Sequence, residues 1–446
     1  MKWVIFSKKE NNVKQNKIIG LCFLFVMVSV LFFSYDMELN AGTANKDDIY
    51  SVLKQKIEGI QPEALKVRHH LHEFPEPCFK ENETSKYIAQ YLRKLGLEVT
   101  EGIAGTGVKA VLKGAKPGRT IGVRADMDAL PITENTDLEF QSKNNGFMHA
   151  CGHDVHMTNG LMSARILSEM KDKIHGTIVF IFQPCEEGTP DGSPSGADRM
   201  IAEGVLENPK IEAMLGLHVM PDYPVGTVAL REGPLMANVA SVFISILGKA
   251  SHGALPHQGV DAIYAASMAV VQFQALISRM KDPNERAVLT IGKMDGGVRL
   301  NVIADRVDME GTVRTFSFEV QDMIRTGIEN ILKGLQLSLG ITYEYRFENS
   351  SRYVKNDAKM TQMVLGLFKK ILGESNVVIT EPMTIGEDFS AYSHKIPSLF
   401  FFLGVGTKGK TMEKIHSPGF SPDEKALYYG PLLLTSAAFE MLDAGH

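Results

Sequence analysis

The chain has 446 residues, which is too long for one ordinary domain and indicates two or three. A hydrophobic share of 44% and a charged share of 22% are typical of a globular protein with a full core. The formal net charge of −5 gives no electrostatic reason to expect a nucleic acid as a partner, so we expect none.

Four cysteines are too few for the disulfide framework that stabilises small secreted domains. Cys22 lies in an apolar N-terminal segment, which leaves Cys78, Cys151 and Cys185 in the body of the chain. Cys151 stands among histidines and is a candidate metal ligand.

Residues 1–45 are predicted to form a signal or membrane-anchor segment outside the folded body. Lysines precede an apolar run, Ile18–Tyr35, and acidic residues follow it. The lysine bias predicts a body on the far side of the membrane from the N-terminus. The run is slightly long for a signal-peptide core and slightly short for a spanning helix of about 20 residues, so both stay open. In either case we expect a membrane-anchored or secreted protein whose N-terminal segment engages the membrane or the secretion machinery.

Helical spacing and strand-like runs alternate in the first half of the body. The predicted helices are Ile49–Leu71, Glu83–Leu95 and Val155–Lys171, and Asp154 is the predicted N-cap of the last. The predicted strands are Val108–Leu112, Thr120–Ala125, Ile178–Gln183 and Ala213–Val219. This alternation predicts an α/β structure with a mostly parallel sheet, in which functional groups gather at the carboxyl ends of the strands.

The pattern changes near Glu232 to the order βαββαβ. The predicted strands are Val239–Leu247, Ala287–Lys293, Arg306–Val313 and Thr342–Phe347, and the helices are Val260–Met280 and Glu319–Leu337. This order is typical of a ferredoxin-like sheet with two helices on one face. The α/β pattern then resumes with Asp357–Leu372, Val377–Ile379, Ser398–Val405 and Pro422–Leu442. We therefore expect a domain over residues 232–347, inserted into a larger one formed by residues 46–231 and 348–446.

The densest group of metal-ligand residue types is the stretch MHACGHDVH, residues 148–156. It includes Cys151 and His153, and thiols and imidazoles are the usual ligands of zinc and its neighbours. A buried cysteine beside surface histidines would give the same pattern, so other ligands must come from elsewhere.

Carboxylates follow two of the predicted strands. Asp126 and Asp128 are two apart, so on an extended backbone they point the same way. They suit metal ligands, partners of a ligand imidazole, or a solvated turn. Glu186 and Glu187 are adjacent, which suits one glutamate that binds metal and one that acts as a general base. A charged turn is the alternative.

Three further histidines have ordinary interpretations when each is considered alone. His218 lies in an apolar strand, where a core residue is the common case, and His416 lies in a loop that could simply be exposed. His252 lies between glycines in the predicted inserted domain. Together the chain supplies the complement of a two-metal hydrolase, with Glu186 as base and these ligands: Cys151, His153, Glu187, His218 and His416.

Several motifs together resemble the M20 metallopeptidase family, in its amidohydrolase branch. That branch includes hippurate hydrolases, N-acyl-amino-acid amidohydrolases and the plant auxin-conjugate hydrolases. The motifs follow the family's order from about Arg68 to the C-terminus: RADMDALP, MHACGHDVH, FQPCEEG, GLHVMP, GKASHGALPHQGVDAI, GGVRLNVIADRVDMEGTVRT, GEDF and HSPGFSPDEKAL.

The resemblance implies a catalytic domain with two divalent metal ions and an inserted lid domain that often forms a homodimer. It implies zinc or manganese, with cobalt or nickel as alternatives, bound by the five ligands given above. Glu186 would be the base, Asp128 would orient a ligand histidine, and His252 would stabilise the oxyanion, in the neighbouring subunit's site or its own. Asn301 and Arg314 would hold the substrate carboxylate. Asp126 stands where other branches carry a ligand histidine, and Cys185 where this branch usually has alanine.

The implied reaction is hydrolysis of the amide bond of a small N-acyl amino acid, such as an acetyl or benzoyl conjugate, to a carboxylic acid and an amino acid. A dipeptidase or carboxypeptidase-like activity uses the same chemistry and is the alternative. A membrane-tethered binding protein that has lost catalysis is a third interpretation. Such a protein would lack a ligand or the base, and here every motif residue is present.

Overall fold

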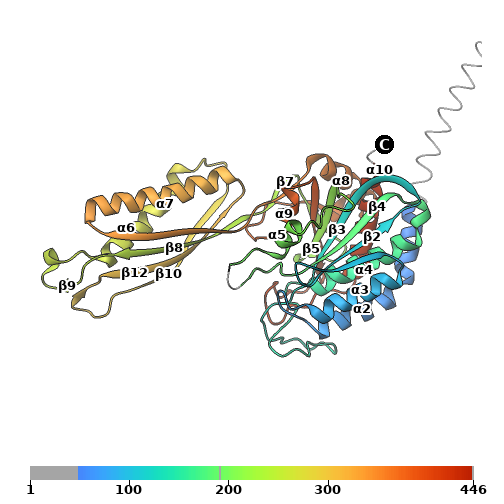
Figure 1. Cartoon of the computed structure of the whole chain (residues 1–446), viewed down its shortest axis with the longest axis horizontal. Helices are drawn as coiled ribbons and strands as arrows, with labels where there is room; N and C mark the ends of the chain where they lie inside the picture. Colours follow the sequence, from blue (N-terminus) through green and yellow to red (C-terminus); the bar gives the residue numbers. More distant parts are fainter. Residues whose placement is uncertain (1–48, 190–191, 444–446) are drawn as a thin grey trace, which may run out of the picture. The chain divides into compact units, whose positions relative to one another are not determined.

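The computed structural model describes residues 49–189 and 192–443. The chain divides into two compact units at Lys56, and the unit that begins at Ile57 carries every element named below. It contains a large mixed sheet and a smaller antiparallel sheet, each with its own helices (Figure 1).

The large sheet has eight strands in the spatial order β1-β2-β4-β3-β5-β16-β6-β15. Its strands are β1 (Glu98–Ile103), β2 (Gly107–Lys113), β3 (Lys116–Asp126), β4 (His175–Gln183), β5 (Ala213–Pro224), β6 (Val228–Leu230), β15 (Val377–Ile379) and β16 (Ser398–Gly406). The central strands β4, β3, β5 and β16 are mutually parallel, so their carboxyl ends lie at one edge. All nine residues of β16 are buried, as expected for a parallel strand covered on both faces.

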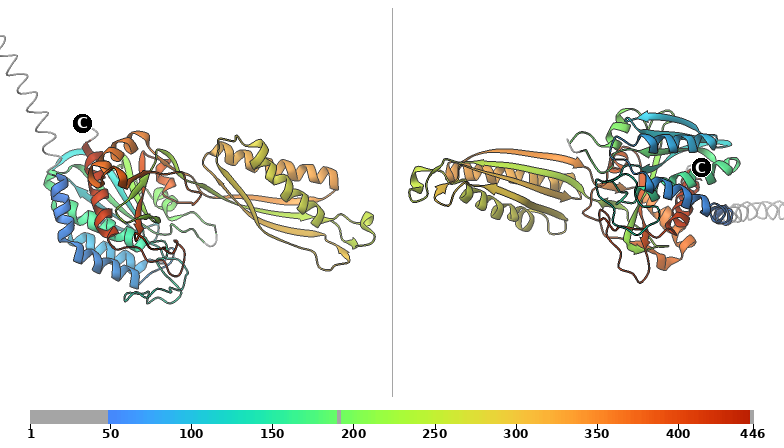
Figure 2. Two further views of the ribbon diagram at one scale, coloured as in Figure 1. Left: turned by 180° about the vertical axis from the view of Figure 1, so that it is seen from behind. Right: turned by 90° about the horizontal axis from the view of Figure 1, so that it is seen from below.

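Helices cover both faces of this sheet (Figure 2). They are α2 (Gln61–Glu73), α3 (Asn82–Lys94), α4 (His153–Glu169), α5 (Gly196–Ala202), α8 (Ala358–Leu372), α9 (Ser390–Ser393) and α10 (Ala426–Asp443). Alternation along β4 shows how the faces are divided. Phe182 contacts Gly160 of α4, whereas Val179 and Ile181 join the apolar cluster that contains Met200 of α5 and Tyr392 of α9.

The smaller sheet has the order β10-β12-β8-β13 and is antiparallel throughout. Its elements in chain order are β8 (Asn238–Leu247), α6 (Ala262–Ala275), β10 (Ala287–Gly296), β12 (Arg306–Thr315), α7 (Phe318–Leu339) and β13 (Thr342–Ser351). One face packs on α6 and α7 around a single apolar cluster. This βαββαβ arrangement and the large mainly parallel sheet confirm the predicted two-domain α/β fold class.

Short strands flank the smaller sheet. β7 (Gly233–Met236) pairs with β14 (Val354–Asn356), and β9 (Ser251–His252) pairs with β11 (Val302–Ile303). β13 also continues beyond residue 347, the predicted end of the insertion. The domain boundaries given above remain predictions.

The prediction that Asp154 caps α4 is wrong. The helix begins at His153 and its N-cap is Gly152, so Asp154 lies inside the first turn. Its buried carboxylate instead accepts hydrogen bonds from Arg68 Nε at 3.1 Å and His72 Nδ1 at 2.9 Å. The Asp154 carboxylate therefore binds side chains of α2, whereas the sequence pattern had predicted that it caps the N-terminus of α4.

The prediction of a membrane-anchored or secreted protein is contradicted and is not retained. Across residues 49–189 and 192–443, no helix combines the length and apolar character needed to cross a membrane. The apolar run over residues 18–35, on which the prediction rested, lies outside the described residues.

The Asp154 cluster predicts that stability falls at alkaline pH. Burial opposes protonation of His72, but Asp154 and Glu134 outweigh it and raise its pKa to about 9. An unfolded histidine titrates near 6.5, so the stabilisation is complete below about pH 6.5 and is lost as pH rises towards 9. Chemical denaturation between pH 6 and 9.5 should show that the free energy of unfolding falls by on the order of 3 kcal/mol.

His72→Gln should remove most of this pH dependence, because glutamine does not titrate. His257→Gln, at an exposed histidine, is the matched control and should retain the wild-type slope. A His72→Gln variant with an unchanged slope would contradict the assignment.

Candidate metal and catalytic site

The predicted site residues come from the carboxyl edge of the parallel strands. Asp126 ends β3, Glu186 and Glu187 follow β4, His218 lies on β5, and His416 lies in the loop after β16. The topology therefore brings these side chains to one edge from distant parts of the chain.

The turn into α4 places Cys151 and His153 beside this edge. Gly152 lies between them at φ +88°, in the left-handed region. A Cβ there would lie 2.4 Å from Cγ2 of Val219 on β5, so both the conformation and the close approach require glycine. The glycine lets the backbone bend so that the thiol and the imidazole both face the edge of the sheet.

The ligand atoms of the predicted residues form groups that share members. In each group the atoms lie within 4.8 Å of one another. One group is Cys151, His153 and His218, and a second is Cys151, Glu187 and His416. A third joins His153 to Glu186 and Glu187. The five predicted ligands and the predicted base therefore form one continuous cluster.

Backbone carbonyls orient the two buried imidazoles. His153 Nδ1 donates to the carbonyl oxygen of Asp128 at 2.8 Å, and His218 Nδ1 donates to that of Val219 at 2.6 Å. Both rings therefore present the lone pair of Nε2 to the cluster. His153 Nε2 is buried and has no hydrogen-bond partner in the described part of the chain. An unpartnered buried nitrogen in this position fits a metal ligand.

The separations and charges also fit a divalent cation. A thiolate and an imidazole on one tetrahedral zinc lie about 3.5 Å apart. Cys151 Sγ lies 3.2 Å from His218 Nε2 and 3.3 Å from His416 Nε2. Burial and the charges of Glu187 and Glu186 raise the pKa of the Cys151 thiol well above its usual range, so an anionic sulfur here needs a cation beside it.

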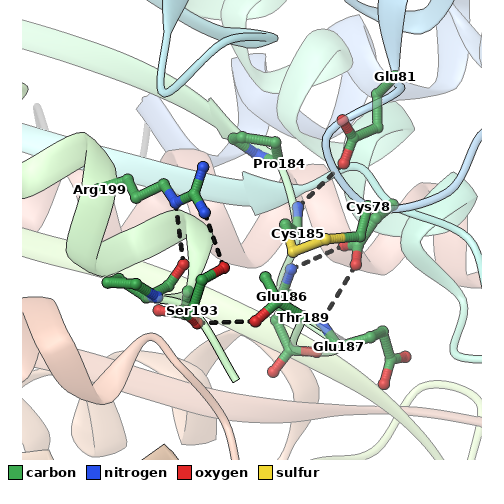
Figure 3. Close-up of a disulfide and its surroundings, with 12 residues drawn as sticks. Cys78, Glu81, Pro184, Cys185, Glu186, Glu187, Thr189, Ser193 and Arg199 are labelled. Atoms are coloured by element: carbon green, nitrogen blue, oxygen red, sulfur yellow. Dashed lines mark hydrogen bonds between the residues drawn. A yellow bond between two sulfur atoms is a disulfide. The ribbon is translucent and has the colours of Figure 1, made fainter. Parts of the chain in front are cut away.

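The turn of residues 185–187, which we call the glutamate turn, is held through its backbone (Figure 3). The carboxylate of Asp128 accepts from Glu186 N at 3.0 Å and from Glu187 N at 3.1 Å. The same carboxylate lies 3.4 Å from His153 Nδ1. Asp128 thus touches both the predicted ligand histidine and the turn that carries the predicted base.

Glu186 has the electrostatic environment of a general base. Burial, Glu387 and Glu187 together raise its pKa well above the usual range for a glutamate. Its Oε1 accepts from the backbone N–H of Asp388 at 3.3 Å, and its Oε2 lies 4.0 Å from His153 Nε2. A carboxylate with a raised pKa can take and return a proton near neutral pH.

Arg124 connects further acids behind the cluster. Its guanidinium is fully buried and contacts the carboxylates of Asp126, Glu387 and Asp388. Asp126 accepts in turn from Nδ1 of His156 at 2.6 Å. Asp126 is therefore engaged by a cation and a second imidazole, and its oxygen lies 3.9 Å from His153 Nε2.

Sequence reasoning assigned no role to Arg124, Glu387 or Asp388. The signals were present, because Arg124 begins RADMDALP and the two acids lie in GEDF. It also did not pair Cys78 with Cys185, which form a disulfide in the structure. Once Cys151 is assigned to metal, these two are the remaining cysteines of the body, although cysteine spacing alone does not define a pairing.

A cavity of about 300 Å³ opens onto the cluster. Among its lining residues are Glu186, Glu187, His218, His416 and, from β12 of the smaller sheet, Arg314. Two larger hollows lie along α2, but no candidate metal-ligand group found among the described residues includes a residue that lines them. Four of the five groups include at least one residue that lines the smaller cavity. Arg314 thus lies at the same cavity as the predicted ligands and base.

His252 and Asn301 lie elsewhere. Gly253 N donates to Asn301 O at 2.8 Å, which joins the two segments in the β9–β11 ribbon. Both side chains are exposed, and neither lines the cavity. The structure brings these two residues close to each other but not to the metal-type cluster of their own chain.

Comparison with known proteins gives a consistent family. Residues 122–439 match the model of peptidase family M20/M25/M40. The chain is 38% identical to thermostable carboxypeptidase 1 of Saccharolobus solfataricus over 86% of its length and 97% of the relative's. It is also 38% identical to the N-acetyl-L-cysteine deacetylase of Bacillus subtilis, over 86% and 89% of the two chains.

A solved structure shares the architecture. The dinuclear metal binding peptidase of family M20 from Bacillus subtilis superposes with a TM-score of 0.75 at 34% identity, over 86% of this chain and 99% of that chain. The family match, the relatives and the shared fold confirm the resemblance found in the sequence motifs. The chain belongs to peptidase family M20/M25/M40 and is an enzyme that hydrolyses amide or peptide bonds.

Proposed function

We propose that the enzyme cleaves the amide bond of small N-acyl amino acids and releases a carboxylic acid and a free amino acid. The observation that carries this proposal is the cavity that joins the cluster of predicted ligands, Glu186 and Arg314. A guanidinium suits the free carboxylate of an amino acid, while the cluster suits attack on an amide carbonyl. The N-acetyl-L-cysteine deacetylase relative supports the same substrate class.

We propose that two divalent ions, zinc or manganese with cobalt or nickel as alternatives, are held by Cys151, His153, Glu187, His218 and His416. When bound, such ions would polarise an amide carbonyl and lower the pKa of water. Glu186 is the residue placed to take a proton from the attacking water and to pass it to the leaving nitrogen. Asp128 and the carbonyl groups behind His153 and His218 fix the orientation of the groups that act.

Dipeptidase or carboxypeptidase-like cleavage is the alternative, and the carboxypeptidase relative at 38% identity favours it. In a dipeptide the acyl side of the scissile bond carries a free ammonium group, which an N-acyl amino acid lacks. Val239 and Ile385 give the cavity an apolar lining that suits an acyl group, whereas Glu387 and Asp388 would suit an ammonium.

We further propose that His252 and Asn301 act on the site of a second copy in a homodimer, with His252 stabilising the oxyanion. Exposed apolar side chains near these residues favour such an association. Leu300 is 99% exposed and Val298 is 87% exposed.

Glu186→Gln tests the base. Glutamine keeps the shape but does not accept the proton, so kcat should fall by roughly 10²- to 10⁴-fold. Metal content, measured by mass spectrometry, should stay near the wild-type value. Glu83→Gln, at an exposed glutamate of α3, is the matched control and should keep full activity. A Glu186→Gln enzyme that retains most of its activity would refute this role.

The same variant tests the dimer. Neither Glu186→Gln nor His252→Ala homodimers should turn over substrate efficiently. A mixed dimer has one site with both an intact Glu186 and an intact partner His252, so it should recover about half of the wild-type activity. No recovery in a purified mixed dimer would place His252 outside the partner's site.

Arg314→Gln tests the substrate class on a panel of N-acetyl and N-benzoyl amino acids, their carboxyl-amidated forms, and dipeptides. Loss of a charged hydrogen bond of about 1.5–3 kcal/mol should raise KM for free carboxylates roughly 10- to 150-fold. KM for amidated substrates should change little. Arg325→Gln, at an exposed arginine of the same unit, is the control. Faster wild-type cleavage of dipeptides than of every N-acyl amino acid would favour the alternative activity.

A further inference from the structure

The glutamate turn is tied in two ways to one short segment, residues 78–81, which lies between α2 and α3 (Figure 3). Cys185, the first residue of the turn, forms a disulfide with Cys78. The backbone N–H of Cys185 also donates to Oε1 of Glu81 at 3.0 Å. One segment thus holds the turn through a covalent bond and a hydrogen bond to a carboxyl group.

The turn needs such restraint because of its backbone conformation. Cys185 lies at φ +52°, a region that residues with a side chain disfavour. Its carbonyl oxygen accepts from Gly196 N at 3.0 Å at the start of α5. A Cβ on Gly196 would lie 1.6 Å from the carbonyl oxygen of Pro184, so α5 packs directly against the turn. Contacts on several sides therefore hold a conformation that the residue itself disfavours.

The Glu81 carboxyl group is held by a hydrogen bond, and a neighbouring carboxylate raises its pKa. It is fully buried, and its Oε2 accepts from Thr106 Oγ1 at 2.6 Å. Burial and the nearby Asp128 carboxylate raise its pKa to about 7. Glu81 and Asp128 both accept hydrogen bonds from the backbone of the same turn, and the disulfide beside them joins that turn covalently to the segment.

The segment also supports the residues that follow the turn. Phe79 lies under the guanidinium of Arg199, 4.0 Å from ring centroid to Cζ. Arg199 donates to Ser193 Oγ at 2.8 Å and to the carbonyl oxygen of Pro194 at 3.1 Å. A shift of the segment would therefore disturb the backbone on both sides of Glu186 and Glu187.

We propose that Cys78 and Glu81 are positioning residues for the general base, and that reduction of the Cys78–Cys185 disulfide lowers the catalytic rate by releasing the glutamate turn. The proposal rests on the assignment of Glu186 as base. Cys78 is partly exposed whereas Cys185 is buried, so solvent reaches the bond from the side of the segment.

A water-soluble phosphine is the reductant. The S–S bond accepts two electrons from phosphorus, the phosphine leaves as its oxide with the oxygen of water, and the two protons of that water end on the two thiols. A cellular dithiol would supply two electrons and two protons and close to its own disulfide.

The first experiment compares oxidised and phosphine-reduced wild-type enzyme at equal metal content. We expect kcat to fall about tenfold, since small misplacements of a catalytic group cost up to about 10²-fold. KM should change less than twofold, because Arg314 lines the cavity whereas residues 78–81 do not. Reoxidation should restore kcat. Unchanged kcat in enzyme with both thiols verified by alkylation would overturn the proposal.

Variants separate positioning from general stability. The Cys78→Ser variant should have the kcat of the reduced wild-type enzyme, and the phosphine should not change that kcat. Glu81→Gln should also lower kcat. If both residues act on Cys185, the Cys78→Ser, Glu81→Gln double variant should lose a smaller factor in kcat than the product of the factors lost by the two single variants. Independent, multiplicative losses, or a Cys78→Ser enzyme with wild-type kcat, would contradict a shared action on the turn.

Hydrogen exchange keeps this test distinct from the proposed function. Reduction should speed exchange of the backbone amides of Cys185–Gly188 while leaving exchange in the smaller sheet unchanged. Absence of turnover by oxidised, metal-loaded enzyme would refute the proposed substrates, but faster exchange on reduction would still support the positioning role. Equal exchange in the two redox states would refute that role whatever the activity.

Discussion

Burial of several carboxylates at one edge of the sheet is the constraint on which the site depends. Acids from the ends of β3 and β4 and from GEDF converge there, and burial alone would protonate them. The guanidinium of Arg124 offsets part of the charge through contacts with Asp126, Glu387 and Asp388. The remaining acids face the ligand-type cluster, where a divalent cation would supply the rest. The same charge balance that permits burial therefore favours metal binding.

The backbone gives this charge arrangement its geometry. Carbonyl oxygens fix the tautomers of His153 and His218, and Asp128 fixes the amides of Glu186 and Glu187. These contacts come from turns at strand ends, where rigid central strands determine the position of each loop. Asp128 contacts both His153 and the glutamate turn, so a change in its position would affect both.

Much of this arrangement was predictable from sequence. Alternating strand and helix patterns gave the fold class, and the parallel order explains why residues as distant as Asp126 and His416 meet. The cap assignment of Asp154 failed because its buried partners, Arg68 and His72, come from another helix. Strand β1 was missed because most of its residues are exposed and give no apolar alternation.

Contacts between segments that are distant in the sequence could not be predicted from the sequence patterns. The Cys78–Cys185 bond joins residues 107 apart, and nothing in either local sequence identifies the other as its partner. Glu81 likewise reads as an ordinary polar residue before a helix, and only the packing shows that it is buried against the glutamate turn. The sequence motifs therefore identified the candidate catalytic residues, whereas the residues that hold them in place could be identified only from the fold.

The central claim is that the cluster binds two divalent ions through Cys151 and its neighbours. The most direct measurement is anomalous X-ray diffraction from crystals of metal-reconstituted enzyme, combined with metal analysis in solution. The account predicts two ions per chain, with Cys151, His153, Glu187, His218 and His416 as the protein ligands. A single ion, no ion, or ions held by other residues would contradict it.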